Sequence, residues 1–226
     1  MEFHWKVVLE NWPVYLEGAR MTLFLSALGV VFGTLVGVFV GLLRSHAYKN
    51  PAMRSLRGLA TVYVELMRGT PFIVQLYLVY YGLPLFFGVD VPELLAGIAA
   101  ISLNSGAYVS EIFRAGIQSV DKGQMEAGRS LGLNWWQSMR HIVLPQAVKR
   151  SLPPLANEFI TLIKESSIVS VIGIQELQFK GRIVSSSTYA PFESLFLVAI
   201  IYLIMTWITG RLVALLERRM KTGDLH

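Results

Sequence analysis

The chain has 226 residues, of which 54% are hydrophobic and 15% are charged. Soluble domains average about 45–50% apolar and about 25% charged residues, so this composition excludes an ordinary soluble enzyme and predicts a membrane protein. There is no cysteine, which excludes disulfides and thiol chemistry, and the net charge is +5.

Residues 1–20 form a predicted N-terminal interfacial segment. Trp5, Val8, Trp12 and Tyr15 have the spacing of a short helix that lies in the membrane surface. Glu2, His4 and Lys6 stand where a secretion signal would have a basic end followed by an apolar core, so we expect the segment to be retained.

Long uncharged runs follow, close to the roughly 17–25 residues that a spanning helix needs. They cover residues 21–43, 69–89, 94–110 and 194–210. A fifth candidate, 152–174, is interrupted by Glu158, Lys164 and Glu165. We therefore predict an all-α polytopic domain with five transmembrane helices over residues 21–217, and a cytoplasmic tail at 218–226.

The first two spans carry backbone signals. Gly29, Gly33, Gly37 and Gly41 recur every four residues, which predicts a helix face that another backbone can approach closely. Pro71, near the start of the second span, predicts a kink on its cytoplasmic side.

The third span ends in a polar face. Asn104, Tyr108 and Glu111 lie at i, i+4 and i+7, with Ser105 beside them. Polar groups at membrane depth point into a bundle or a wet cavity. Two interpretations stay open here, contact with a transported substrate and hydrogen bonding between helices.

Residues 121–145, which we call the knuckle, have the signals of two short helices. Asp121 with Gln124 predicts the start of the first, and Gly132 a left-handed cap at its end. Asn134 with Gln137 repeats the start signal.

The second knuckle helix has one apolar face, made of Trp135, Met139, Ile142 and Val143, and Pro145 is expected just past its end. Glu126, Arg129 and Arg140 would remain available to a partner protein.

In the interrupted fourth span, Glu158, Thr161 and Glu165 follow helical spacing, which places two carboxylates on one side. Ionisable residues inside a membrane favour a functional role, so we expect substrate contact here. The alternative for Lys164 is an ion-pair partner or a side chain that reaches toward the aqueous edge.

Basic residues predict which loops are cytoplasmic. One set of loops holds Arg44, Lys49, Arg54, Arg57, Arg114, Lys122, Arg129, Arg140, Lys149, Arg150, Arg211, Arg218, Arg219 and Lys221. The other holds Lys6, Arg20, Lys180 and Arg182. This asymmetry predicts an external N-terminus, a cytoplasmic C-terminus and a cytoplasmic knuckle.

Catalysis within this chain is not expected. Residues 123–130 approach the phosphate-binding pattern G-x-x-x-x-G-K-[ST], but Arg129 replaces the lysine and Glu126 would repel a phosphate. The four histidines lack metal-ligand spacing, and no serine has a paired histidine and acid nearby. We predict neither a metal nor a nucleic-acid site.

The knuckle resembles the EAA signature of ATP-binding-cassette importer permeases, the coupling helix that sits in a cleft of the ATPase. The matching residues are Glu126, Ala127, Gly128, Gly132, Ile142, Leu144 and Pro145, with Gly128 where alanine is more usual. Four further stretches are similar to the polar amino acid permease family, including glutamine, histidine and arginine systems. They are Arg68-Gly69-Thr70-Pro71 with Gln75, residues 104–108 with Glu111, Leu152-Pro153-Pro154 with Asn157, and residues 164–167.

This resemblance implies a five-helix permease subunit in a bacterial cytoplasmic (inner) membrane, paired with an identical or homologous copy. It further implies two cytosolic ATPases that carry ATP and magnesium, so that this chain holds no cofactor, and an external amino acid binding protein. The substrate would lie near the middle of the bilayer. Its expected contacts are Asn104, Ser105, Tyr108, Glu111, Glu158, Thr161 and Glu165, and the expected ATPase contacts are Glu126, Ala127, Gly128, Gly132, Ile142 and Pro145. A basic amino acid is favoured over glutamine, because the expected site has more acidic side chains than side chains that could bind a substrate carboxylate.

Two alternatives come from other classes of protein. An ion-coupled secondary carrier would use Glu158, Lys164 and Glu165 as a relay, although such carriers usually show inverted repeats and unwound half-helices. A membrane scaffold or receptor subunit would use the knuckle to bind some other partner.

Overall fold

A computed structural model describes residues 5–45 and 50–221, so the extreme tail (222–226) lies outside the described part. The elements are α1 (Trp5–Glu10), α2 (Trp12–Ser45), α3 (Pro51–Gly69), α4 (Phe72–Phe87), α5 (Glu93–Gln118), α6 (Lys122–Ser130), α7 (Trp135–Ser138), the π-helical turn η1 (Met139–Val143), α8 (Leu144–Glu165), the 3-10 helix η2 (Ser166–Ile172), α9 (Leu177–Thr188) and α10 (Pro191–Lys221). The predicted all-α class is confirmed.

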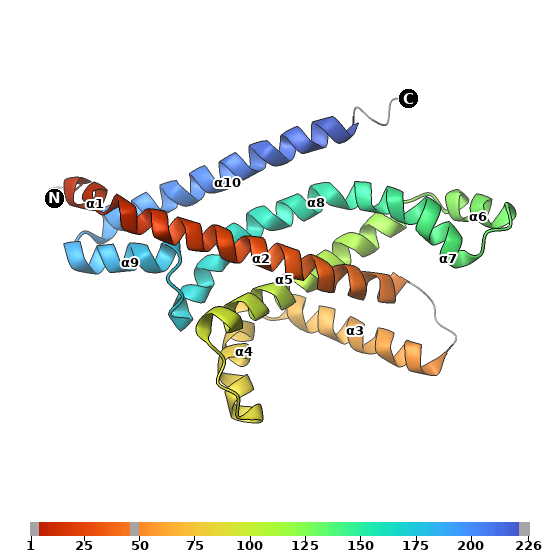
Figure 1. Ribbon diagram of the computed structural model, residues 1–226, viewed down its shortest axis with the longest axis horizontal. Coiled ribbons are helices and arrows are strands. Elements are labelled where there is room, and N and C mark those ends of the chain that lie inside the picture. Colours follow the sequence, from red (N-terminus) through yellow and green to blue (C-terminus); the bar gives the residue numbers. More distant parts are fainter. Residues whose placement is uncertain (1–4, 46–49, 222–226) are drawn as a thin grey trace.

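Length and composition mark two of the described helices as able to cross a bilayer, Trp12–Ser45 and Pro191–Leu215. The bent pair α3 and α4 would be a third. The predicted spans in α5 and α8 are more polar, and both helices pack among others, where polar side chains can find partners. The knuckle and α9 lie at opposite ends of the long axis (Figure 1).

Helices α2 and α5 approach closely along the glycine stripe. A Cβ atom added to Gly33 would lie 2.8 Å from the Cβ of Ser105, and one added to Gly37 would lie 2.5 Å from the Cβ of Val109. Side chains larger than hydrogen are therefore excluded, and the predicted packing face is confirmed.

The second predicted span is broken rather than kinked. Thr70 and Pro71 are extended, and the axes of α3 and α4 differ by 115°. A residue before proline avoids the helical region, which ends α3, while proline suits the start of the next helix. As a result α4 projects sideways from the bundle (Figure 1).

The N-terminal boundary differs from the prediction. Helix α2 begins at Trp12, before the apolar run that starts at Met21. Tyr15 is fully buried rather than at a membrane surface, and its hydroxyl lies 2.7 Å from the Ser194 hydroxyl of α10. The side chain of Val8 lies outside the described part. Burial against α10, which local spacing does not encode, decides this boundary.

At the same end, Glu176 joins α2, α9 and α10. Its buried carboxylate accepts the backbone N–H groups of Gln178 and Phe179 at the start of α9. It also accepts the hydroxyls of Tyr202 at 2.7 Å and Thr22 at 3.4 Å. The sequence analysis missed this residue: Gln178 and Phe179 are local partners, but Thr22 and Tyr202 lie far away in the chain.

We predict that Gly37→Ala lowers the thermal unfolding temperature of the purified protein, because overpacking a helix contact costs about 1–3 kcal/mol. Gly58, on α3, has no atom within 4 Å of its added Cβ. Gly58→Ala should therefore be neutral or stabilising, by up to about 1 kcal/mol from helix propensity. Equal effects of the two substitutions in a fluorescence melting experiment would contradict the packing interpretation.

Candidate functional site

The candidate substrate site lies between α5 and α8. Ser105 on α5 is fully buried, and its hydroxyl faces the Glu158 carboxylate of α8. That hydroxyl nevertheless has no partner in hydrogen-bond geometry. Buried polar groups are nearly always paired, so a hydroxyl without a partner marks this position as a candidate for ligand binding. The structure brings Ser105 and Glu158, two of the expected substrate contacts, close together.

Acidic charge accumulates beside this hydroxyl. Glu165 is close enough to Glu158 for the two carboxylates to repel each other. Lys164 interacts with Glu165 and compensates one of the two charges. Thr161 lies on the same helix and donates to the backbone carbonyl of Asn157. When both carboxyl groups are ionised, the cluster carries an excess of one negative charge, which a bound cation would balance.

Asn104 has a structural partner. It is buried, and its amide donates to the side-chain carbonyl of Gln75 at 2.9 Å. The Gln75 amide in turn donates to the carbonyls of Met67 and Thr70, at 2.8 and 3.0 Å, at the break between α3 and α4. Of the two interpretations of Asn104, the structure favours hydrogen bonding between helices. The sequence placed Gln75 near Pro71 but did not reveal this role.

Tyr108 lies one turn closer to the knuckle and is 36% exposed. The guanidinium of Arg68 stands 5.6 Å from the centre of its ring, a cation–π contact. Arg68 is in the last turn of α3, directly before the break. Tyr108 therefore remains accessible to a ligand from the open side.

Glu111 is not an open substrate contact in this structure. Its carboxylate lies 2.5 Å from Arg44 of α2 and 2.6 Å from Arg114, and Arg68 approaches it to 3.8 Å. The side chain is only 18% exposed. The arginines lie on three helices, and their convergence was not visible in the sequence. We reassign Glu111 to an ion cluster that joins α2, α3 and α5.

The knuckle follows most of its predicted signals. Asp121 accepts the backbone N–H of Gly123, and Gly132 has a φ of 87°, in the left-handed region that glycine favours. Asn134 and Gln137 form a complete capping box. The predicted return bond of Gln124 is replaced, because its side chain instead accepts from Gln146 at 3.4 Å.

The end of the second knuckle helix was predicted incorrectly. Pro145 lies in the first turn of α8, and α7 passes through the π-helical turn η1 into α8 without a break. Because the helix is continuous, Pro145 takes an interior position and removes one backbone hydrogen bond, directly after the π-helical turn. The chain from Trp135 to Glu165 is therefore a continuous helical rod.

Packing, rather than helix propensity, explains why a glycine occupies position 128. A Cβ added there would lie 2.7 Å from the Cδ1 of Ile142 and 2.8 Å from the Ser138 hydroxyl. The two arms of the knuckle thus touch through Gly128 and Ile142. Outside this contact the surface is open, and its exposed residues include Glu126, Ala127, Arg129, Gly132, Arg140 and Pro145.

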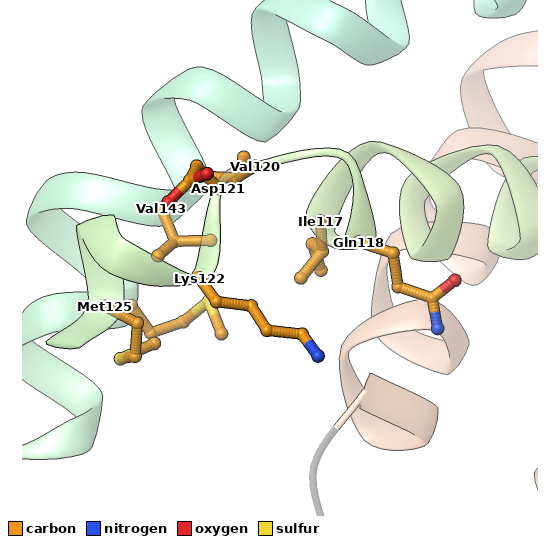
Figure 2. Close-up of a pocket in the computed structure, with 8 residues that line it drawn as sticks. Ile117, Gln118, Val120, Asp121, Lys122, Met125 and Val143 are labelled. Atoms are coloured by element: carbon orange, nitrogen blue, oxygen red, sulfur yellow. The ribbon is translucent and has the colours of Figure 1, made fainter.

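A pocket of about 400 Å³ opens where α5 meets the knuckle (Figure 2). Ile117, Val120, Met125 and Val143 form its apolar wall. Figure 2 shows the Lys122 side chain extending across the open side, between Met125 and Gln118. The base of the knuckle is therefore loosely packed on one side.

Residues 29–222 match the family described as "Binding-protein-dependent transport system inner membrane component". The chain belongs to this family. The predicted resemblance to importer permeases is thereby confirmed, and the chain is an inner-membrane permease subunit of an ATP-binding-cassette importer. Such a subunit works with ATP-binding subunits and a substrate-binding protein.

Two curated relatives cover almost the whole chain. The glutamine transport system permease protein GlnP of Escherichia coli (strain K12) is 37% identical over 222 residues, which are 98% of this chain and 99% of GlnP. The arginine transport system permease protein ArtQ of Bacillus subtilis (strain 168) is 36% identical over 224 residues, 99% of this chain and 100% of ArtQ.

A solved structure is also similar over nearly its full length. The crystal structure of an amino acid ABC transporter with histidines matches with a TM-score of 0.90 and 43% identity, covering 97% of this chain and 100% of that chain. The MetNI methionine transporter in an inward-facing conformation has a TM-score of 0.77 at 20% identity and supports the fold alone.

We predict that Gln75→Leu and Asn104→Leu each lower the free energy of unfolding by about 1–3 kcal/mol, because each leaves a buried polar partner unsatisfied. The double variant should lose less stability than the two single variants added together, because both partners of the same hydrogen bond are then absent. A double-mutant cycle from denaturant melts measures this coupling. Strict additivity would show that the pair does not hold the break.

Proposed function

We propose that this permease imports a polar amino acid, with a basic one preferred, by alternating access. The observation that carries this proposal is the unpaired Ser105 hydroxyl, buried beside the Glu158 carboxylate. The net negative charge of Glu158, Glu165 and Lys164 suits a cargo with an ammonium or guanidinium group. The names of the relatives, which specify glutamine and arginine, support the same class of cargo.

In this mechanism each predicted residue has a distinct task. Glu158 attracts the amino group or a cationic side chain, and Ser105 and Tyr108 supply hydrogen bonds. Glu165 and Thr161 line the same side of α8. Asn104 acts at one remove, because it holds Gln75 and thereby the break that borders the site.

We further propose that the chain itself performs no catalysis. Two cytosolic ATPases would bind ATP and magnesium and act on the exposed knuckle surface around Glu126, Ala127, Gly132 and Pro145. Closure of the ATPases would move the knuckle, and the continuous rod from Trp135 to Glu165 would carry this motion to Glu158.

The remaining parts of the assembly follow from the same proposal. A second permease chain, either identical or homologous, would complete the pathway, and an extracytoplasmic binding protein would deliver the amino acid. The N-terminus would face outward and the C-terminus the cytoplasm, in a bacterial cytoplasmic membrane, as the distribution of basic residues favours.

The break at Thr70 and Pro71 resembles the discontinuous helices on which ion-coupled carriers build their sites. Membership of the importer family nevertheless decides against the carrier that the sequence left as an alternative.

We predict that Glu158→Gln reduces amino acid uptake into proteoliposomes at least about tenfold, because the ammonium group loses its ionic partner, worth about 1.4 kcal/mol or more. The vesicles contain the permease, its ATPase and the binding protein. Glu10→Gln, which removes an exposed carboxylate of α1, is the matched control and should transport normally. Unchanged uptake and ATP hydrolysis in Glu158→Gln would refute the assigned role.

The knuckle can be tested at Gly132. We predict that Gly132→Val uncouples the ATPase, because a β-branched residue is strained at a φ of 87°. Gly132→Asn should preserve coupling, since asparagine tolerates the left-handed region. The measurement is ATP hydrolysis stimulated by the loaded binding protein. Equal stimulation in both variants would show that the knuckle conformation is not required.

A further inference from the structure

Positive charge is in excess at the ion cluster around Glu111. Three guanidinium groups, from Arg44, Arg68 and Arg114, share one carboxylate, so the cluster has a net charge of 3 − 1 = +2. Glu111 is already bound closely by Arg44 and Arg114, at 2.5 and 2.6 Å. Arg68 stands farther away, at 3.8 Å. Its charge is therefore the least compensated of the three.

Arg68 is also the most accessible member of the cluster. Its side chain is 46% exposed, compared with 12% for Arg44 and 35% for Arg114. The guanidinium lies over the ring of Tyr108, which is itself exposed. An aromatic face can hold the guanidinium in place while its N–H groups remain free for an anion.

The backbone beside Arg68 strengthens this positive pole. Helix α4 begins at Phe72, and no side chain caps its first turn. The N–H groups of a first turn have no intrahelical acceptor and, with the helix dipole, favour a negative charge. Arg68 and the start of α4 are separated only by the extended residues of the break.

A negative pole lies at nearly the same level of α5. Tyr108 marks the position of Arg68 along α5, and Ser105 marks that of Glu158. Three residues of α-helix correspond to a rise of about 4.5 Å. Along the axis of α5, the basic group and the acidic group are therefore offset by less than one helical turn. An α-amino acid carries its ammonium and carboxylate groups on the same carbon atom, so it matches this pair of poles.

We propose that Arg68 binds the α-carboxylate of the transported amino acid while Glu158 binds its ammonium group or cationic side chain. This inference rests on the proposed function and adds a specificity-determining residue to it. It also revises the expectation that the site has few side chains able to bind a substrate carboxylate. The planar guanidinium can donate two parallel hydrogen bonds to a carboxylate, a geometry that lysine cannot reproduce.

The test is direct binding to the purified permease–ATPase complex, without the binding protein, because the latter would impose its own selectivity. The probes are L-arginine, L-glutamine and L-histidine, each compared with its α-carboxamide. We expect the wild type to bind at least one free acid about tenfold more tightly than the amide. Arg68→Gln should abolish this ratio, and Arg68→Lys should retain only part of it.

Two controls separate this role from a structural one. Arg57→Gln removes an exposed arginine from the same helix and should keep the acid-to-amide ratio. Glu158→Gln should weaken both ligands by a similar factor and leave the ratio unchanged. A merely structural Arg68 would lower the affinity for acid and amide together.

The possible failures are distinguishable. If the wild type binds none of these amino acids, the proposed function fails and this inference fails with it. If the wild type prefers the free acid and Arg68→Gln keeps that preference, the role of Arg68 is overturned while the proposed function stands. If Arg68→Gln cannot be purified with the ATPase, the ratio in Arg68→Lys decides, and a full wild-type ratio there would overturn the proposal.

Discussion

The close approach of α2 and α5 sets the position of most polar groups in this permease. Because glycines replace side chains along the contact, α5 can lie directly on the backbone of α2, and Gly33 meets Ser105 while Gly41 meets the backbone of Ser110. This register turns Ser105 toward α8 and places Glu111 within reach of Arg44. A side chain at any central glycine would push α5 away from α2. The polar side chains that α5 carries would then all be displaced.

Within that framework, pairing distinguishes polar groups that hold the fold from those free to act on a ligand. Gln75 and Asn104 satisfy each other and the carbonyl groups freed at the break, and Glu176 is satisfied by donors from three helices. The Ser105 hydroxyl has no such partner, and Arg68 shares a carboxylate that two nearer arginines already neutralise. These two groups lack a complete set of partners, which is why they support a binding role where the paired groups do not.

The π-helical turn gives the knuckle its mechanical significance. If α7 ended at a loop before α8, the knuckle could move by bending that loop without moving α8. Instead the helical hydrogen bonding continues from Trp135 through η1 into α8, and Gly128 locks α6 against Ile142. Under the proposed function, a force on the exposed surface would reach the carboxylates of α8 along this helix, which also contains Pro153 and Pro154.

The membrane class, the glycine contact, the caps of the knuckle and the face shared by Glu158 and Glu165 all follow from the sequence, because each depends on composition or on residues less than a few turns apart. The angle of the break at Pro71, the burial of Tyr15 and the reassignment of Glu111 do not, since each involves partners distant in the chain. Helical spacing places a side chain on a face, but only tertiary packing determines whether that side chain finds a partner there. For this reason the sequence named the acidic residues of the candidate site, and the fold alone brought Arg68 to Tyr108 and Glu111.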